Sequence, residues 1–317
     1  MSIYFLGVDG GQSSTTAMVG DETGRVIGYG RGGPCNHVKT GDGRKKFLGA
    51  METCLGAAFA QAGLDAATVR FRAACLGFSG GPADKEALLR EMLRTDEMQV
   101  SHDGLIALSG ATAGAPGIIT IAGTGQLCFG RNASGATARA GGWGFSFGDE
   151  GGGYDMTRQA LRAALRMEEG WGAETSLRAR LLDATGANTA NELLHRFYTD
   201  EFPRPRIASF SKLVDQAAVE GDMVAQDILQ QSARHLAIYT AAVRQRLFQP
   251  GEEVAVAYIG GVFRSDLLRE RFRALVELED GCHVGSPIFG PAAGALLEAY
   301  RMAGLHVELQ NVPEQEK

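Results

Sequence analysis

Apolar and polar positions along the first 115 residues change their spacing in a way that predicts strands and helices. Period-two alternation and β-branched runs indicate strands, whereas three- and four-residue spacing indicates helices. A turn composition at 21–24 predicts a hairpin between the second and third strands. The predicted strands are 3–9, 14–20, 25–30, 70–77 and 97–101, and the predicted helices are 42–62, 84–94 and one that begins at Asp103.

The order of strand, glycine turn, strand, turn, strand occurs a second time about 110 residues later, after Pro116. Its strands are predicted at 117–122, 126–130 and 136–140, and the repeat indicates a structural duplication. We therefore expect an N-terminal domain of residues 1–115 plus 291–317 and a C-terminal domain of residues 116–290.

The rest of the second half is predicted to be mostly helical between residues 150 and 250. The longest helix begins at Gly221-Asp222 and ends before Pro250-Gly251. A strand at 254–259 runs into Gly260-Gly261, a helix follows from Ser265, and the last helix covers 291–303 with Pro291 in its first turn. The polar tail after Gly304 is expected to be frayed.

Composition narrows the class of protein. Apolar residues make up 44% and charged residues 21%, which is ordinary for a globular chain. The net charge of −6 argues against nucleic acid as a partner, and the short basic cluster at 44–46 is expected to be solvated. No apolar stretch is long enough to span a bilayer, and Asp9 interrupts the N-terminal apolar run before a signal peptide could form.

The five cysteines are scattered and form no CxxC pair, which favours reduced thiols and a cytoplasmic protein rather than disulfides or zinc. The six histidines also lack ligand spacing. His37 and His102 could line a pocket because they adjoin candidate site residues.

The segment LGVDGGQSSTT at 6–16 carries the first chemical signal. A strand that ends on Asp-Gly-Gly and turns into a second strand exposes backbone N–H groups and small hydroxyls, which suit an anion such as phosphate. Asp9 would repel phosphate unless a cation lies between them, so it predicts Mg²⁺ with a nucleotide. An ordinary hairpin turn is the structural alternative.

Two further glycine turns follow strands, Gly123-Thr124-Gly125 and Gly260-Gly261. The first lies at the place in the second half that Gly10 and Gly11 occupy in the first half. If the halves face each other, the two turns could clamp a polyphosphate, and the third could let a flat base lie against the backbone.

With these motifs the chain resembles the sugar-kinase, Hsp70 and actin superfamily, within it the N-acetylglucosamine kinase-like branch of the BadF/BadG/BcrA/BcrD ATPases. LGVDGGQSST is similar to the first phosphate motif, TIAGTGQ (120–126) to the second, AYIGGVFRS (257–265) to the adenosine motif, and FGPAAGALLEAY (289–300) to the closing helix. GGWGFSFGDEGGGYD (141–155) resembles the most diagnostic signature. The resemblance implies an α/β fold of two ribonuclease-H-like domains, each a mixed sheet with helices, that flank a nucleotide cleft.

The resemblance also implies roles for matching residues. Ser13 and Thr124 would touch the phosphates of ATP, and the backbone of Ala208 would lie against the adenine. The implied sugar contacts are Asn36, Gly142, Trp143 and Asp149, with Asp103 as the base that receives the proton of the attacking hydroxyl. The family likeness further implies a homodimer.

Residue chemistry supports these roles. A carboxylate at a helix start stays ionised, and phosphoryl transfer tolerates a weak base because its transition state is loose. For both Asp103 and Asp149, helix capping is the structural alternative. Asn36, Asp149 and Trp143 supply the polar and aromatic groups that sugars need, and Trp143 is expected to be exposed because three glycines flank it.

Four departures from the family pattern put the identity of the sugar in doubt: Gln12 in the first phosphate turn, the bulky 145–147, Gly152 and Asp155. The predicted activity is ATP- and Mg²⁺-dependent phosphorylation of the 6-hydroxyl of an amino sugar, N-acetylglucosamine first. Two alternatives stay open: an iron–sulfur ATPase that activates a CoA-ester dehydratase or reductase, and a non-catalytic nucleotide- and sugar-binding switch.

Overall fold

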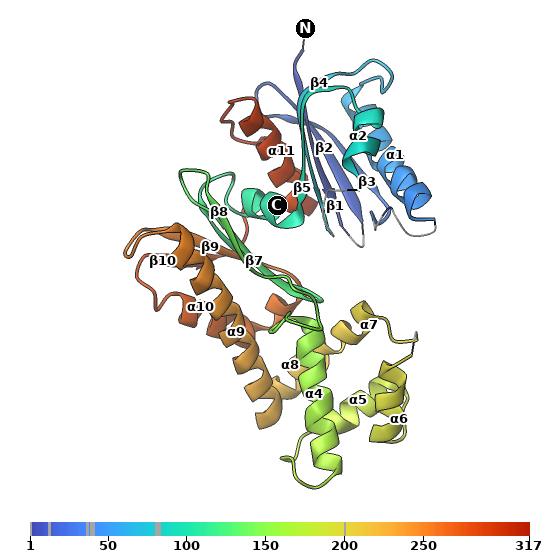
Figure 1. Ribbon diagram of the computed structural model, residues 1–317, viewed down its shortest axis with the longest axis vertical. Coiled ribbons are helices and arrows are strands. Elements are labelled where there is room, and N and C mark those ends of the chain that lie inside the picture. The colour runs from blue at the N-terminus through green and yellow to red at the C-terminus, as the bar shows by residue number, and fades with distance from the viewer. Residues whose placement is uncertain (1, 12–13, 36–37, 39–41, 80–83, 200) are drawn as a thin grey trace. The chain divides into compact units, whose positions relative to one another are not determined.

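A computed structural model of the chain describes residues 2–11, 14–35, 38, 42–79, 84–199 and 201–317. The chain divides into two compact units, which are described separately (Figure 1). Unit 1 comprises residues 1–117 and 286–317, and unit 2 comprises residues 118–285. Among the described residues, none of the helices combines the length and the apolar content that a membrane crossing requires.

The sheet of unit 1 is mixed and has the order β3-β2-β1-β4-β5. Strand β1 pairs antiparallel with β2, so that Asp9 lies opposite Thr16, and parallel with β4 on its other side. Strands β4 and β5 are also parallel. The bounds are β1 (Tyr4–Gly10), β2 (Thr15–Asp21), β3 (Val26–Gly32), β4 (Phe71–Phe78) and β5 (Thr95–His102).

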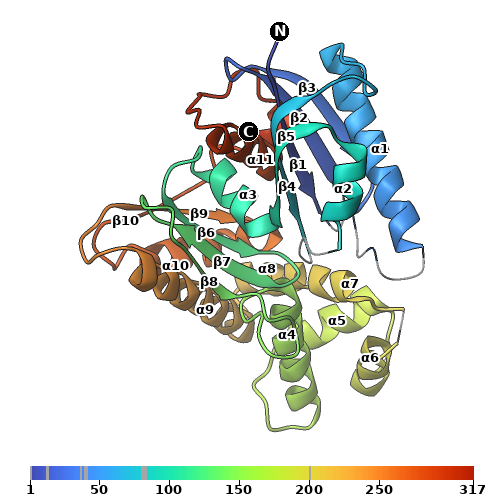
Figure 2. The same cartoon turned by 45° about the horizontal axis from the view of Figure 1, so that its top comes forward.

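Helices cover both faces of this sheet. On one face α1 (Gly43–Ala62) and α2 (Glu86–Met92) pack on a core that includes Phe47 and Leu89. On the other face, α3 (Asp103–Ala111) and α11 (Pro291–Met302) enclose a second core (Figure 2). Helix α11 approaches α3 closely because Gly294 has no side chain: a Cβ there would lie 1.9 Å from the carbonyl oxygen of Ile106.

The sheet of unit 2 has the order β10-β9-β6-β7-β8, which matches unit 1 strand for strand. Strands β6, β9 and β10 are parallel, and β7 and β8 form an antiparallel pair. The predicted α/β class with a duplicated mixed sheet is therefore confirmed. The bounds are β6 (Gly117–Ala122), β7 (Gln126–Arg131), β8 (Thr137–Gly141), β9 (Val254–Ile259) and β10 (Cys282–Gly285).

Residues 150–250 are mostly helical, as predicted. The Asp222 side chain caps α9 (Met223–Leu247) by accepting the N–H groups of Val224 and Ala225, which explains the predicted start at Gly221-Asp222. The other elements of unit 2 are α4 (Gly153–Glu168), α5 (Leu177–Thr185), α6 (Ala190–Phe197), α7 (Arg204–Ser209), α8 (Ser211–Val219), the 3₁₀ turn η1 (Gly261–Arg264) and α10 (Asp266–Val276).

The expectation of a frayed tail after Gly304 is wrong. The carbonyl of Gln310 accepts the N–H of Val26 at 2.9 Å, and that of Glu316 accepts the N–H of Gly290 at 2.8 Å. Val312 is buried in the core between α11 and the sheet. The tail, which includes the 3₁₀ turn η2 (Glu314–Glu316), is therefore part of unit 1. Although the tail is largely polar, Val307, Leu309 and Val312 pack in or against this core, and the Glu316 carboxylate accepts the N–H of Ala292 at 3.1 Å.

Other predicted boundaries shift by a few residues, and one strand was missed. The helix predicted at 84–94 is α2, which covers only Glu86–Met92, and the strand predicted at 97–101 extends over Thr95–His102. Strand β10 has only four residues, Cys282–Gly285, which is too short for a recognisable alternation.

Two glycine-to-alanine substitutions in helices of unit 1 should change stability in opposite directions. Gly294→Ala forces a Cβ into the backbone of α3, so it should lower the free energy of unfolding by about 1–3 kcal/mol or more. Gly56→Ala on α1 meets nothing within 4 Å and should raise it by about 0.5–1 kcal/mol. Urea titration followed by circular dichroism measures both, and equal shifts of one sign would contradict the close helix packing.

Candidate functional site

In unit 1, candidate residues follow the carboxyl ends of three parallel strands. Asp9 is the next-to-last residue of β1. Ser79 directly follows β4, and Asp103 directly follows β5. Ligands of open α/β sheets bind at this end of the strands. Gly10 permits close packing there, since a Cβ would lie 2.1 Å from the ring of Phe78. The N–H of Ser79 donates to the carbonyl of Gly10 at 3.2 Å, which ties the ends of β1 and β4 together.

The carboxylate of Asp103 is not the cap of α3, so the capping alternative is wrong for this residue. His102 occupies the cap position, and its Nδ1 accepts the N–H of Leu105 at 3.3 Å. Asp103 is the first helical residue, and its Oδ2 accepts the hydroxyl of Ser79 at 2.8 Å. The half-buried carboxylate is thus oriented by a side chain outside its own helix.

Asp9 lies in a strongly acidic environment. Burial, followed by the nearby carboxylates of Glu316 and Asp103, raises the pKa of Asp9 to about 7. A bound cation would reverse this effect, because it would favour the ionised carboxylate. Within the described residues no three His, Cys, Asp or Glu side chains are placed to hold a metal by themselves. Asp9 therefore fits Mg²⁺ of the kind that takes one or two carboxylates together with water and phosphate oxygens.

The first glycine turn, after β1, is described only in part. The N–H of Gly11 donates to the carbonyl of Ser14 at 2.9 Å, and its carbonyl accepts the N–H of Cys35 at 3.0 Å. Gly11 therefore links the turn after β1 to the segment after β3. Gln12, Ser13, Asn36 and His37 lie outside the described residues.

In unit 2 the second glycine turn, residues 123–125, contacts the start of α4. The N–H of Gly153 donates to the carbonyl of Gly123 at 2.8 Å, and that of Tyr154 donates to the carbonyl of Thr124 at 3.0 Å. A Cβ on Gly152 would lie 2.9 Å from the backbone of Gly125. The turn and the helix start thus form one continuous backbone surface.

The third glycine turn, Gly260-Gly261, lies beside the second one. Gly260 has a φ of 114°, and a Cβ on it would lie 2.2 Å from the carbonyl oxygen of Ala122. This conformation favours glycine strongly. Gly260 and Gly261 are both exposed. Two of the three glycine turns singled out from the sequence are therefore neighbours within unit 2.

Ala208 joins this group from the end of α7. A Cβ on Gly153 would lie 3.0 Å from the carbonyl oxygen of Ala208, and the hydroxyl of Thr157 donates to the carbonyl of Ile207 at 2.9 Å. A cavity of about 240 Å³ adjoins the third turn, between α4, α8 and η1. Its lining residues are Met156, Ser211, Lys212, Asp215, Gln216, Gly261, Val262, Arg264 and Ser265.

Asp149 occupies the left-handed region, with a φ of 65°. A residue other than glycine is held there at a cost of about 1–2 kcal/mol, and such strain gathers at functional sites. The residue is 4% exposed, and its Oδ1 accepts the N–H of Gln126 at 3.4 Å. The cap position of α4 belongs to Gly152, so the capping alternative is wrong for Asp149 as well.

The signature segment before Asp149 exposes aromatic rings. The Trp143 side chain is 67% exposed, as expected from its flanking glycines, and the guanidinium of Arg139 lies 5.0 Å from the centre of its ring. Gly142, with a φ of 72°, turns the chain after β8. Trp143 thus offers an accessible aromatic face beside the strand end.

Gln126 was missed in the sequence analysis. Its side chain lies against Gly141, where a Cβ would be 2.0 Å from Nε2. Both amide atoms are buried without a hydrogen-bond partner among the described residues. Such buried polar groups are rare in native proteins and call for a water or a ligand. The available signal was its position directly after the Gly-Thr-Gly turn.

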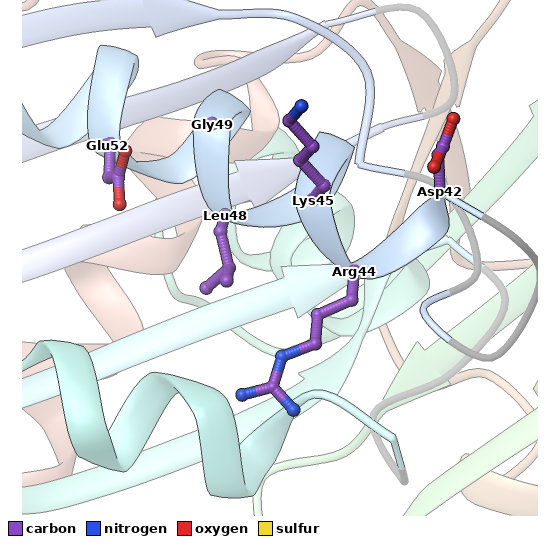
Figure 3. A pocket seen from close by; sticks show the side chains of 6 residues that line it. All are labelled: Asp42, Arg44, Lys45, Leu48, Gly49 and Glu52. Carbon is purple, nitrogen blue, oxygen red and sulfur yellow. The ribbon is translucent and has the colours of Figure 1, made fainter.

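A separate surface hollow at the start of α1 is formed by side chains of that helix and its cap (Figure 3). Arg44, Lys45 and Lys46 are exposed there, as the sequence predicted for a solvated basic cluster. The hollow contains none of the predicted site residues; its lining residues are Asp42, Arg44, Lys45, Leu48, Gly49 and Glu52.

Comparisons with known proteins show which chains this one is similar to. An N-acetylmuramic acid/N-acetylglucosamine kinase of Clostridium acetobutylicum is 31% identical over 283 residues, which cover 87% of this chain and 90% of the relative. An N-acetyl-D-glucosamine kinase of Dictyostelium discoideum is 28% identical over 313 residues, which cover 93% of this chain and 97% of the relative.

A solved structure of a candidate N-acetylglucosamine kinase from Chromobacterium violaceum superposes with a TM-score of 0.72 at 27% identity, over 93% of this chain and 98% of that one. The model of the BadF/BadG/BcrA/BcrD ATPase family matches residues 6–299. The match confirms the resemblance inferred from the sequence motifs, and the chain belongs to the BadF/BadG/BcrA/BcrD ATPase family.

Proposed function

We propose that this protein is an ATP-dependent kinase that phosphorylates the 6-hydroxyl of an amino sugar, most favourably N-acetylglucosamine. The kinases of C. acetobutylicum and D. discoideum, which match nearly the whole chain, support an amino sugar as the substrate class. The observation that carries the proposal is the carboxylate of Asp103, which does not cap its helix and is oriented by Ser79.

Asp103 would accept the proton of the attacking sugar hydroxyl. Phosphoryl transfer proceeds through a loose transition state, so the positioning of this carboxylate matters more than its basicity. The hydroxyl of Ser79 restricts the rotation of this carboxylate. This restraint suits a base that must be in position when the sugar binds.

Unit 2 would hold the nucleotide mainly through backbone groups. Thr124 with Gly123 and Gly125 would contact the phosphates, beside the N-terminus of α4, which attracts anions. Ala208 and the exposed Gly260 and Gly261 would lie against the adenine, next to the 240 Å³ cavity. Gly10, Gly11 and Ser13 of unit 1 would contact phosphate oxygens.

Asp9 would hold Mg²⁺ through water, and the ion would neutralise the charge that develops on the transferring phosphoryl group. The sugar would contact Asn36, Gly142, Trp143 and Asp149. The buried amide of Gln126, next to Gly141, would find its missing partner in the sugar or in a water bound with it.

The iron–sulfur alternative finds no support in the chemistry of the thiols. All five cysteines are buried, and none of them forms a disulfide. Burial raises the pKa of Cys54 and of Cys128 to about 12, which keeps these thiols protonated, whereas cluster ligands are thiolates. The non-catalytic switch differs from the kinase only in turnover, so the assay below separates the two.

The direct test is an assay of ADP release with ATP and Mg²⁺ over a panel of amino sugars and plain hexoses. We expect the highest kcat/KM with N-acetylglucosamine or its lactyl ether, and NMR of the product should show phosphate on the 6-oxygen. Sugar binding without ADP release would identify a switch instead.

Asp103→Asn should lower kcat about 10²–10⁴-fold, the usual contribution of a positioned base, because the amide cannot accept the proton. Ser79→Ala should lower kcat about fivefold, as expected for the loss of one orienting hydrogen bond. Asp96→Asn, an exposed carboxylate on the same strand β5, is the matched control and should leave kcat unchanged. Sugar-dependent ADP release measures all three, and near-wild-type turnover by Asp103→Asn would remove Asp103 from this role.

Asp9→Asn should raise the Mg²⁺ concentration needed for half-maximal activity about 10- to 100-fold, as for other residues that hold a metal through its water. The KM for the sugar should not change, because Asp9 is assigned no sugar contact. Mg²⁺ titration of both proteins after removal of metal with EDTA gives the comparison. An unchanged Mg²⁺ requirement would show that the ion is held elsewhere.

A further inference from the structure

The loop between β8 and α4, residues 142–152, is held by polar contacts rather than by a core of its own. We name it the signature loop. Two of its aromatic side chains are largely exposed, Trp143 at 67% and Phe147 at 88%. Apolar burial therefore contributes little to its shape, and hydrogen bonds and ion pairs must fix it.

One ion pair on α4 contacts both halves of this loop. Asp155 Oδ1 and Arg158 Nη2 are 2.6 Å apart, and the Asp155 side chain is almost fully buried. Asp155 Oδ2 accepts the N–H of Gly151 at 3.3 Å. Arg158 Nη1 donates to the carbonyl of Phe145 at 3.4 Å. The pair thus ties a point before Asp149 and a point after it to the same turn of helix.

Further contacts hold the signature loop on both sides of Asp149. The ring of Phe145 packs edge-on against the ring of Tyr154, with ring centres 5.2 Å apart. The guanidinium of Arg204 lies 4.8 Å from the centre of the Phe145 ring. Beyond Asp149, the hydroxyl of Tyr239 on α9 donates to the carboxylate of Glu150. The strained backbone of Asp149 lies between these attachments. Strained conformations persist only where the surroundings over-determine them.

We propose that Asp155 and Arg158 are positioning residues that hold the signature loop in the shape that presents Asp149 and Trp143 to the sugar. The inference rests on the proposed function and names two residues to which that function assigns no contact with substrate. It predicts that loss of the pair impairs sugar binding and leaves nucleotide binding intact, because the phosphate turn at 123–125 bonds to Gly153 and Tyr154 through backbone groups alone.

The test compares Arg158→Met with Arg162→Met. Both variants remove a guanidinium from α4, but Arg162 lies one turn further on, is exposed and has no described contact with the loop. Arg158→Met should raise the sugar KM about 10- to 100-fold, as expected when a binding group is misplaced by about 1 Å. Its KM for ATP should stay within about twofold of the wild-type value, and Arg162→Met should change neither constant.

A second readout needs no turnover. In a Trp171→Phe background, Trp143 is the single tryptophan of the chain and reports on the signature loop. Arg158→Met should change the acrylamide quenching of Trp143 fluorescence, whereas Arg162→Met should not. Asp155→Asn keeps the shape of the side chain and removes its charge, so it should reproduce both effects if Arg158→Met folds poorly.

The outcomes separate this inference from the proposed function. If the wild-type protein phosphorylates no sugar in the panel, the proposed function fails, whereas the quenching experiment still tests whether the pair holds the loop. Unchanged quenching in both Arg158→Met and Asp155→Asn overturns the inference. So does an equal rise in the KM values for sugar and ATP, which would indicate general structural damage.

Discussion

Direct contact between backbones at the end of β6 is the constraint on which the candidate site of unit 2 depends. A Cβ on Gly152 would lie 2.9 Å from the backbone of Gly125, and a Cβ on Gly260 would lie 2.2 Å from the carbonyl oxygen of Ala122. The absence of side chains lets the start of α4 donate hydrogen bonds to the turn after β6, and it lets the turn after β9 approach the backbone of Ala122. Exposed amides can then face a phosphate without an intervening side chain.

The same sheet topology serves a different chemistry in unit 1. Strand β1 corresponds to β6, but its end carries Asp9 where the second sheet carries only glycine and threonine. The neighbouring parallel strands add Ser79 and Asp103, so two carboxylates, those of Asp9 and Asp103, lie near each other at this end of the sheet. At the corresponding end in unit 2 the carboxylate comes instead from Asp149, outside the sheet, and the turn itself consists of glycine and threonine.

Periodicity and glycine turns were sufficient to predict nearly all the strands, the duplicated mixed sheet and the long helix after Asp222. Features that depend on tertiary partners could not be predicted in this way. The four-residue β10 has too few positions for a pattern, and the tail acquires structure only because Val312 and Glu316 find partners in unit 1. The capping alternatives were wrong because a neighbour, His102 or Gly152, occupies the cap position in each case.

Side-chain identity within the signature loop explains why the sugar was harder to predict than the reaction. The proposed nucleotide contacts are largely backbone contacts, which the spacing of the glycines indicates. The proposed sugar contacts depend instead on side chains: the strained Asp149, the exposed Trp143 and the buried amide of Gln126, which lacks a hydrogen-bond partner among the described residues. In the positioning role proposed above, the Asp155–Arg158 pair, six and nine residues after Asp149 along the chain, holds the loop that carries Asp149 and Trp143. Because a single altered attachment could reorient Asp149 without disturbing the phosphate turn, substrate choice in this protein can change while the phosphoryl-transfer machinery stays the same.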